Sequence, residues 1–240
     1  MGDLLVDHDG DVTTLTLNRD AKRNSLSEPL VEGLLHQVRE ACSNGTGLLV
    51  FRGSGKSFSA GFDFSGFDEQ GEATLLRRFI RIEQLLQAVA HAPVTTLALV
   101  HGPTFGAGAD LAVACDHRVF DPSATLRMPG FRFGLALGTR RLAQRTGRDF
   151  ALAMLQEART ISAAEALRAG VASHVTAREE WESVVLERAR HARSLSPTAS
   201  ARLHHCLTPD TRDGDLAELV RSAAAPGLVD RIRAFKEESR

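Results

Sequence analysis

Two stretches of the chain share one local design, a short apolar run that leads into a turn built from small residues. "LLVFRG" (48–53) is followed by "FSAGFD" (58–63), and "TTLALVHG" (95–102) is followed by "FGAGAD" (105–110). Apolar runs of this length that end at glycine are typical of buried strands. Two equivalent strand-to-turn crossings, one in each repeat, can each direct a backbone N–H group to the same point.

The rest of the chain continues this rhythm and then changes. Asp9-Gly10 predicts a hairpin over the first twenty residues, and Ser27 with Pro29 predicts a helix start. Strand, strand and helix recur up to residue 138, which favours an α/β fold of repeated ββα units. We expect a spiral of short sheets with helices outside rather than one long parallel sheet. From Thr139 the pattern is almost entirely helical, with helices expected over 177–194, 198–206, 210–224 and 226–238.

Composition narrows the class of partner. The 240 residues are 43% hydrophobic and 25% charged, with a formal net charge of −1. Because Lys and Arg are scattered, nothing favours nucleic acid or a membrane surface over a small molecule. The three cysteines (Cys42, Cys115 and Cys206) form no CxxC pair, so we expect a reducing, cytoplasmic setting in which each behaves as a small apolar residue.

The second glycine motif predicts a site for an anion or for an oxygen that becomes one. A helix that begins at Gly106 or Ala107 aims unpaired N–H groups and a partial positive charge at whatever lies beyond its end. Asp110 then falls within about one turn of that end. A nucleotide loop is the alternative, but "GPTFGAG" has no GKS/T ending and gives no GxGxxG in register. For Asp110 itself, a proton-transfer role and a purely structural helix-dipole role both stay open.

Five segments together resemble the enoyl-CoA hydratase/isomerase (crotonase) superfamily over nearly the whole chain. They are "VTTLTLNRDAKRNSL", "FSAGFD", "HGPTFGAGADLAVACDHRVF", "ISAAEALRAGVASHVT" and "VDRIRAFKEE". The resemblance implies a crotonase-like spiral of ββα units over 1–180 that carries an acyl-CoA site. It also implies a helical region over 181–240 that mediates homotrimers or dimers of trimers.

The resemblance also implies roles for particular residues. The N–H groups of Phe62 and Ala107 would hold a thioester carbonyl, and Asp110 would be the catalytic acid or base. Contacts with CoA would come from the family positions matched by Arg23, Ser59, Phe235 and Lys236.

One family position is altered. Hydratases of the family place glutamates at the positions of Asp110 and of residue 130, where this chain has Gly130. Glu69 and Glu72 are candidates for a replacement carboxylate, and the arginines around the altered segment are candidates to pair with Asp110 or with a carboxylate on the acyl group. These arginines are Arg127, Arg132, Arg140 and Arg141.

The sequence leaves several functions open. The first is enoyl-CoA hydration or double-bond isomerisation through a thioester enolate, with hydration disfavoured by Gly130. Decarboxylase or thioesterase variants of the family and a non-catalytic acyl-CoA-binding or assembly protein are the alternatives. We expect no metal and no redox cofactor, because no His/Cys/Asp cluster has ligand spacing, so the CoA thioester would be a substrate.

Overall fold

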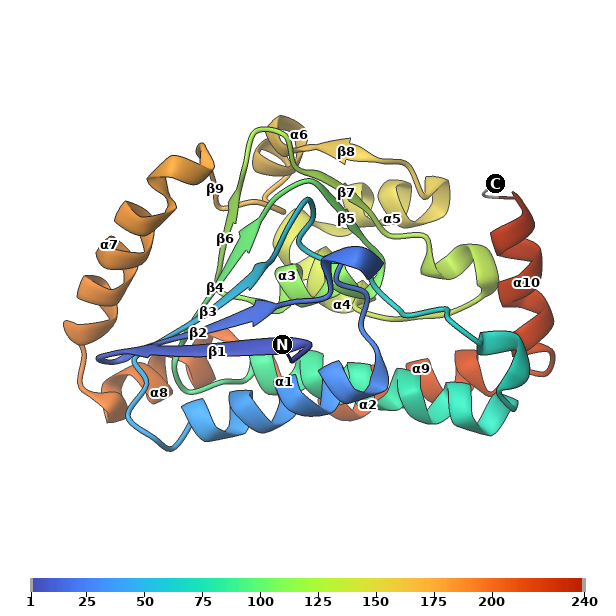
Figure 1. Ribbon diagram of the computed structural model, residues 1–240, viewed down its shortest axis with the longest axis horizontal. Helices are drawn as coiled ribbons and strands as arrows, with labels where there is room; N and C mark the ends of the chain where they lie inside the picture. Colours follow the sequence, from blue (N-terminus) through green and yellow to red (C-terminus); the bar gives the residue numbers. More distant parts are fainter. Residues whose placement is uncertain (1, 239–240) are drawn as a thin grey trace.

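A computed structural model describes residues 2–238, in which strands form two sheets and helices surround them (Figure 1). The six-stranded sheet has the order β1-β2-β3-β4-β6-β9, and the three-stranded sheet has the order β5-β7-β8. The strands are β1 (Leu4–Asp9), β2 (Val12–Leu17), β3 (Leu48–Gly53), β4 (Thr95–Val100), β5 (Pro103–Phe105), β6 (His117–Phe120), β7 (Thr125–Arg127), β8 (Ile161–Ser162) and β9 (His174–Val175).

The helices follow the predicted order along the chain. They are α1 (Glu28–Ala41), α2 (Glu72–Ala90), α3 (Ala107–Ala114), α4 (Thr139–Thr146), α5 (Arg148–Glu157), α6 (Ala163–Arg168), α7 (Trp181–Arg193), α8 (Pro197–Leu207), α9 (Arg212–Ala223) and α10 (Leu228–Glu238). Short 3-10 turns lie at η1 (Asp20–Lys22), η2 (Phe67–Glu69), η3 (Gly130–Phe133) and η4 (Arg178–Glu180). The Ser27 side chain accepts from the Leu30 N–H, which confirms the predicted start of α1.

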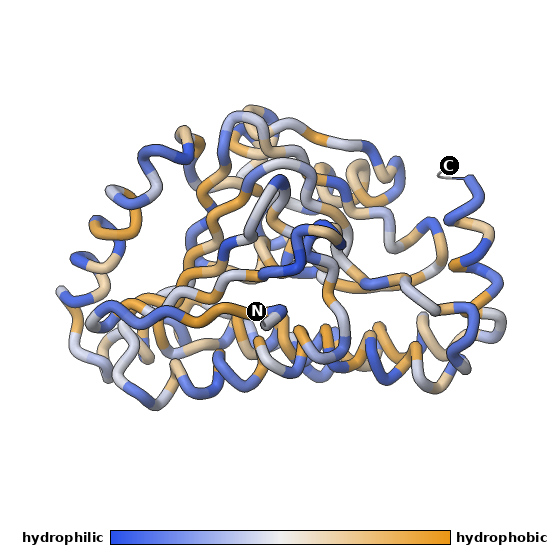
Figure 2. Tube along the Cα trace, in the orientation of Figure 1, coloured by the Kyte–Doolittle hydropathy of each residue, from blue (hydrophilic) through white to orange (hydrophobic). Residues whose placement is uncertain are grey.

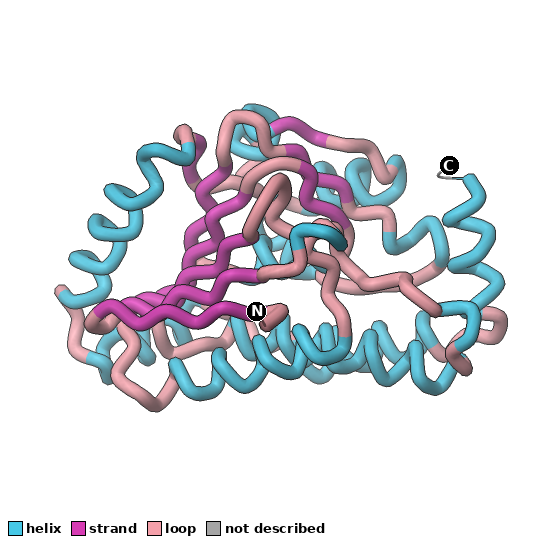
Figure 3. The backbone as a smooth tube through the Cα atoms, in the orientation of Figure 1, coloured by secondary structure: helices cyan, strands magenta, loops and turns pink. Residues whose placement is uncertain are grey.

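The sheets explain the repeated sequence pattern and correct one expectation. The first strands of successive repeats, β2, β3, β4 and β6, pair in parallel in one sheet, and the second strands β5 and β7 pair in the other. Figure 3 shows the strands in magenta, with the helices in cyan around them. The predicted hairpin is present as the antiparallel pair β1 and β2, with Asp9 opposite Val12. The predicted α/β fold of repeated units, with its helical C-terminal region, is confirmed. Only the expectation of short sheets in place of one long parallel sheet was wrong, because β2, β3, β4, β6 and β9 pair in parallel in one sheet.

Two apolar layers cover the six-stranded sheet. On one face, leucines and phenylalanines of the strands pack against α1, α2 and α3. On the other face, Val50, Leu97 and Val119 pack against Trp181 and Ala189 of α7. Orange, hydrophobic segments run along the central strands in Figure 2, while α7 alternates between polar and apolar residues. Cys115 is buried, as expected of a small apolar residue, whereas Cys42, just after α1, and Cys206 in α8 are exposed.

The helices after residue 180 do not form a separate core. Leu219 and Ala223 of α9, and Leu228 and Ile232 of α10, belong to the same buried cluster as the strands and α1–α3. In Figure 1, α10 lies at the opposite end of the molecule from α7. The expected role of 181–240 in oligomerisation stays a prediction. No helix within residues 2–238 is long and apolar enough to cross a membrane.

Asn24 ties together the loops that follow β2 and β3. Its side-chain oxygen accepts from the Arg19 N–H at 2.8 Å, and its amide nitrogen donates to the carbonyls of Ser54 at 2.9 Å and Ser57 at 2.8 Å. Its own carbonyl accepts from the Ser59 hydroxyl at 2.8 Å. Because Asn24 is fully buried and has φ +53°, it combines a tight backbone turn with a complete set of side-chain bonds.

Replacing Asn24 by Ala should therefore destabilise the protein, because three buried or part-buried backbone groups lose their partner. We expect a loss of about 2–4 kcal/mol in the free energy of unfolding, measured by urea denaturation. Asn18→Ala is the matched control, since the Asn18 side chain makes one exposed bond to the Gly2 carbonyl. Equal midpoints for the two variants would show that Asn24 does not hold these loops together.

Candidate active site

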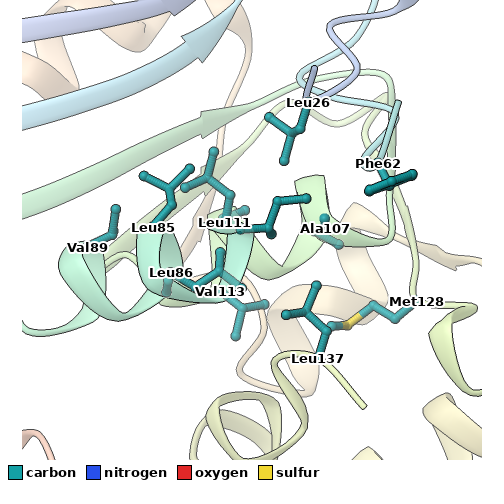
Figure 4. Close-up of a cluster of buried hydrophobic side chains, with 14 of the residues drawn as sticks. Leu26, Phe62, Leu85, Leu86, Val89, Ala107, Leu111, Val113, Met128 and Leu137 are labelled. Atoms are coloured by element: carbon teal, nitrogen blue, oxygen red, sulfur yellow. The ribbon is translucent and has the colours of Figure 1, made fainter. Parts of the chain in front are cut away.

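A cavity of about 290 Å³ lies between the start of α3, the turn η3, the segment that leads into α4 and the helix α10. Phenylalanines, leucines and Met128 form most of its wall. Asp110 is the one carboxyl-bearing residue and Arg127 the one cationic residue among the described residues that line it. Phe62, Ala107, Met128 and Leu137 lie together at one end of the buried cluster in Figure 4, away from Leu85 and Val89 of α2. The cavity is therefore an apolar chamber with a single acid.

The two glycine motifs meet at this cavity. Gly61 has φ +81°, and a Cβ there would overlap the Phe105 carbonyl oxygen and lie 3.0 Å from the amide nitrogen of Ala107. Only glycine allows the two turns to approach so closely. The loop before Phe62 and the start of α3, predicted to converge on one point, therefore do converge.

The backbone N–H groups of Phe62 and Ala107 have no acceptor among residues 2–238. Ala107 is the first residue of α3, where a helix leaves its N–H groups unpaired. The neighbouring Gly106 N–H is already used, since it donates to the Arg127 carbonyl at 2.8 Å. Both residues line the cavity, so two unused donors border the same space.

The ring of Phe62 is held firmly in place. It stacks on Phe79 with ring centroids 4.3 Å apart, and the Arg78 guanidinium lies 4.2 Å from its centroid. Arg78 also donates to the Asp63 carbonyl at 2.7 Å. These contacts hold Phe62 and the peptide group that follows Asp63 in place.

Asp110 lies in an apolar environment and lacks a strong partner. It is 4% exposed, and its Oδ1 atom has no hydrogen-bond partner within the described chain. Burial raises the pKa of Asp110 well above that of an ordinary aspartate; Arg141 opposes this rise and Glu83 adds to it. Gly138 has φ +63°, and any Cβ there would overlap the Asp110 carboxyl. The acid therefore favours its protonated form, and the start of α4 is fitted around it.

Gly130, the position at which hydratases of the family have a glutamate, lies at the cavity. Gly130 lines the cavity in η3, and its carbonyl accepts from the Leu135 N–H at 2.9 Å. Glu69 and Glu72, the candidates for a replacement acid, are exposed and do not line the cavity.

Two of the four residues expected to contact CoA lie on paired loops beside the cavity. Arg23 is exposed, has φ +50°, and its carbonyl accepts from the Ala60 N–H at 2.8 Å. Ser59 is fully buried; its hydroxyl accepts from the Gly61 N–H at 3.2 Å, and its carbonyl accepts from the Phe105 N–H at 3.0 Å. Contact with CoA stays a prediction for both residues.

The other two lie on α10. Phe235 lines the cavity, with its ring centroid 5.2 Å from that of Phe133. Lys236 Nζ lies 4.5 Å from the ring centroid of Phe67 and 5.9 Å from that of Phe64. The end of the chain thus returns to the cavity and places a cation beside it.

The arginines separate into different roles. Arg127 lines the cavity, and its Nε donates to the Ala158 carbonyl at 2.7 Å. Arg140 pairs with Asp215 at 2.6 Å and Arg132 donates to the Glu157 carbonyl at 3.0 Å. Arg141 pairs with Glu83 at 2.5 Å, rather than with Asp110.

Glu83 was missed by reasoning from the sequence. It is 1% exposed on α2, among the apolar residues Phe79, Ile82 and Leu86. A charged residue three or four positions from apolar neighbours on both sides was the available signal. No group of three or more His, Cys, Asp or Glu residues within 2–238 is placed to hold a metal ion.

The chain is similar to known proteins over most of its length. The family model for enoyl-CoA hydratase/isomerase matches residues 7–224. A probable enoyl-CoA hydratase, echA6, of Mycobacterium tuberculosis is 33% identical over 202 residues, which cover 83% of this chain and 79% of that protein. The 2,3-dehydroadipyl-CoA hydratase of Escherichia coli is 33% identical over 180 residues, which cover 73% of this chain and 69% of that protein.

A solved structure extends the match to the whole fold. The crystal structure of an enoyl-CoA hydratase/isomerase candidate from Bordetella parapertussis has a TM-score of 0.96 and 47% identity, covering 97% of this chain and 98% of that one. The fold described above is thus matched over nearly the whole chain. The chain belongs to the enoyl-CoA hydratase/isomerase family, with the crotonase fold.

Proposed function

We propose that this protein binds acyl-CoA thioesters and moves a proton along the acyl chain, as in double-bond isomerisation. The Phe62 and Ala107 N–H groups would hold the thioester oxygen. Asp110 would take a proton from one carbon and return it to another, and the enolate charge would rest on the held oxygen in between. The single observation that carries this proposal is a lone carboxyl in an apolar cavity bordered by two unused N–H donors.

Between hydration and double-bond isomerisation of an enoyl-CoA, the site favours isomerisation. Adding water needs groups that position the water and move its protons, and Asp110 is the one carboxyl that lines the described cavity. Proton transfer within the acyl chain needs one acid–base group. A carboxyl with a raised pKa suits this task, because its ionised form is a stronger base than an ordinary aspartate.

A non-catalytic acyl-CoA-binding protein is the second candidate. The observation that favours it is the Oδ1 atom of Asp110, which is buried without a polar partner, as expected for an acid that stays protonated. In that case the two N–H groups would bind the thioester without any reaction following.

Incubation with a panel of 2-enoyl-, 3-enoyl- and saturated acyl-CoA thioesters in D₂O, followed by mass spectrometry, separates these candidates. We expect deuterium uptake and a shifted double bond without addition of water. Asp110→Asn should lower the rate by roughly 10²–10⁴-fold, with thioester binding retained. A water adduct would replace isomerisation by hydration, and binding without any reaction would support the non-catalytic candidate.

The same Asp110→Asn variant should change the pH dependence of stability. Unfolded aspartate releases its proton above about pH 4, whereas burial keeps folded Asp110 protonated to higher pH. The folded state then binds more protons, so wild-type stability should fall relative to the variant as pH rises from about 4 to 7. Urea unfolding at several pH values measures this difference, and parallel stability curves would contradict a raised pKa.

Ala107→Pro tests the donor on α3. Proline is well suited to the first position of a helix, and Gly106 before it has no Cβ to meet the proline ring. Losing one oxyanion donor should lower turnover by roughly 10²–10³-fold. Arg148→Pro is the matched control, because Arg148 also begins a helix after a glycine with positive φ. Equal turnover in the two variants would remove Ala107 from the proposed mechanism.

A further inference from the structure

A buried ion pair lies beside Asp110, outside the lining of the cavity. Arg141 Nη2 is 2.5 Å from Glu83 Oε2, with the two side chains 8% and 1% exposed. Arg141 Nη1 is 3.5 Å from Asp215 Oδ2, and the Arg141 Nε atom is buried without a partner. Burying three charged groups from α2, α4 and α9 costs free energy unless their geometry is well satisfied.

The pair is joined to Asp110 through α4. Gly138, the residue just before α4, packs so closely on the Asp110 carboxyl that no Cβ fits between them. Arg141 follows three residues later, in the first turn of α4. Asp110 belongs to α3, which packs between α2 and α4. Movement of Arg141 or Glu83 would therefore be transmitted to the contact between Gly138 and Asp110.

We propose that Arg141 and Glu83 are positioning residues that together decide how readily the Asp110 carboxyl gives up its proton. The guanidinium supports the ionised, proton-accepting form of Asp110 inside an apolar cavity. Glu83 holds the guanidinium in place, and its negative charge weakens the stabilisation that Arg141 gives to the Asp110 carboxylate. Without Arg141 the buried carboxyl would stay protonated and could not begin a proton transfer, whereas without Glu83 it would ionise too easily and become a weaker base.

The charged groups around Asp110 are consistent with opposite effects of Arg141 and Glu83. Arg141 and Glu83 are the two charged groups that act on the pKa of Asp110, in opposite directions and after burial itself. Asp215 holds the other edge of the Arg141 guanidinium and also pairs with Arg140 at the surface. Arg127, in the cavity wall, is bound to the Ala158 carbonyl. The catalytic consequence rests on the proposed proton transfer, but the effect on Asp110 does not.

The test is a titration of Asp110 itself, followed by NMR of ¹³C-labelled aspartate in the intact protein, with the signal assigned from Asp110→Asn. Glu83→Gln should lower the midpoint by about one pH unit, because a neighbouring negative charge is removed. Arg141→Met should raise it. Opposite shifts cannot come from general loosening of the fold, which would move both midpoints toward that of ordinary aspartate.

Two further variants keep the test decisive. Glu32→Gln breaks the Arg81–Glu32 pair on the solvent side of α1 and α2 and should leave the midpoint unchanged. Arg141→Met alone leaves Glu83 buried without a partner, so the double variant Glu83→Gln/Arg141→Met replaces it if the single variant fails to fold. The double variant should also raise the titration midpoint of Asp110.

A Glu83→Gln midpoint equal to that of Glu32→Gln, or shifted upward, would overturn the proposal. Because no substrate is present, this result is independent of whether the protein turns over a thioester. Where turnover is measurable, the pH of half-maximal rate should move in the same direction as the NMR midpoint in each variant.

Discussion

The close approach of the loop before Phe62 to the start of α3 is the constraint on which the site depends. Gly61 lies against Phe105 and Ala107, and a Cβ on Gly108 would lie 2.6 Å from the Ser59 carbonyl oxygen. Side chains at these glycines would force the two turns apart. The approach is what brings two unpaired N–H groups to the edge of one cavity, and the parallel pairing of β3 and β4 sets the two turns beside each other.

Beside that contact, the fold places the Asp110 carboxyl among apolar side chains. Residues of η3, α5 and α10 form an apolar wall around Asp110, and Arg141 pairs with Glu83 rather than with Asp110. Burial raises the pKa of this carboxyl, so the folded protein should lose stability as the pH rises above the pKa of unfolded aspartate. Burial of the Asp110 carboxyl thus has two consequences: it lowers the stability of the folded protein at neutral pH, and it makes the ionised carboxylate a stronger base.

The C-terminal helices show that the site and the core cannot be separated. The helix α10 contributes Ile232 to the shared apolar core, and three residues later Phe235 lines the cavity. The next residue, Lys236, lies over Phe67. One amphipathic helix thus closes the core and the cavity at once, so changes in its packing would affect both.

The sequence by itself determined the strand–turn repeats, the order of the helices, the start of α1 at Ser27 and the start of α3 just after Gly106, with Asp110 in its first turn. These features follow from local periodicity, capping and glycine placement, which residues close in sequence decide. It did not determine that the strands join one continuous parallel sheet, that Glu83 pairs with Arg141, or that Glu69 and Glu72 stay outside. Those outcomes depend on which helices meet, and burial and charge pairing between residues far apart in sequence exist only after the tertiary structure has formed.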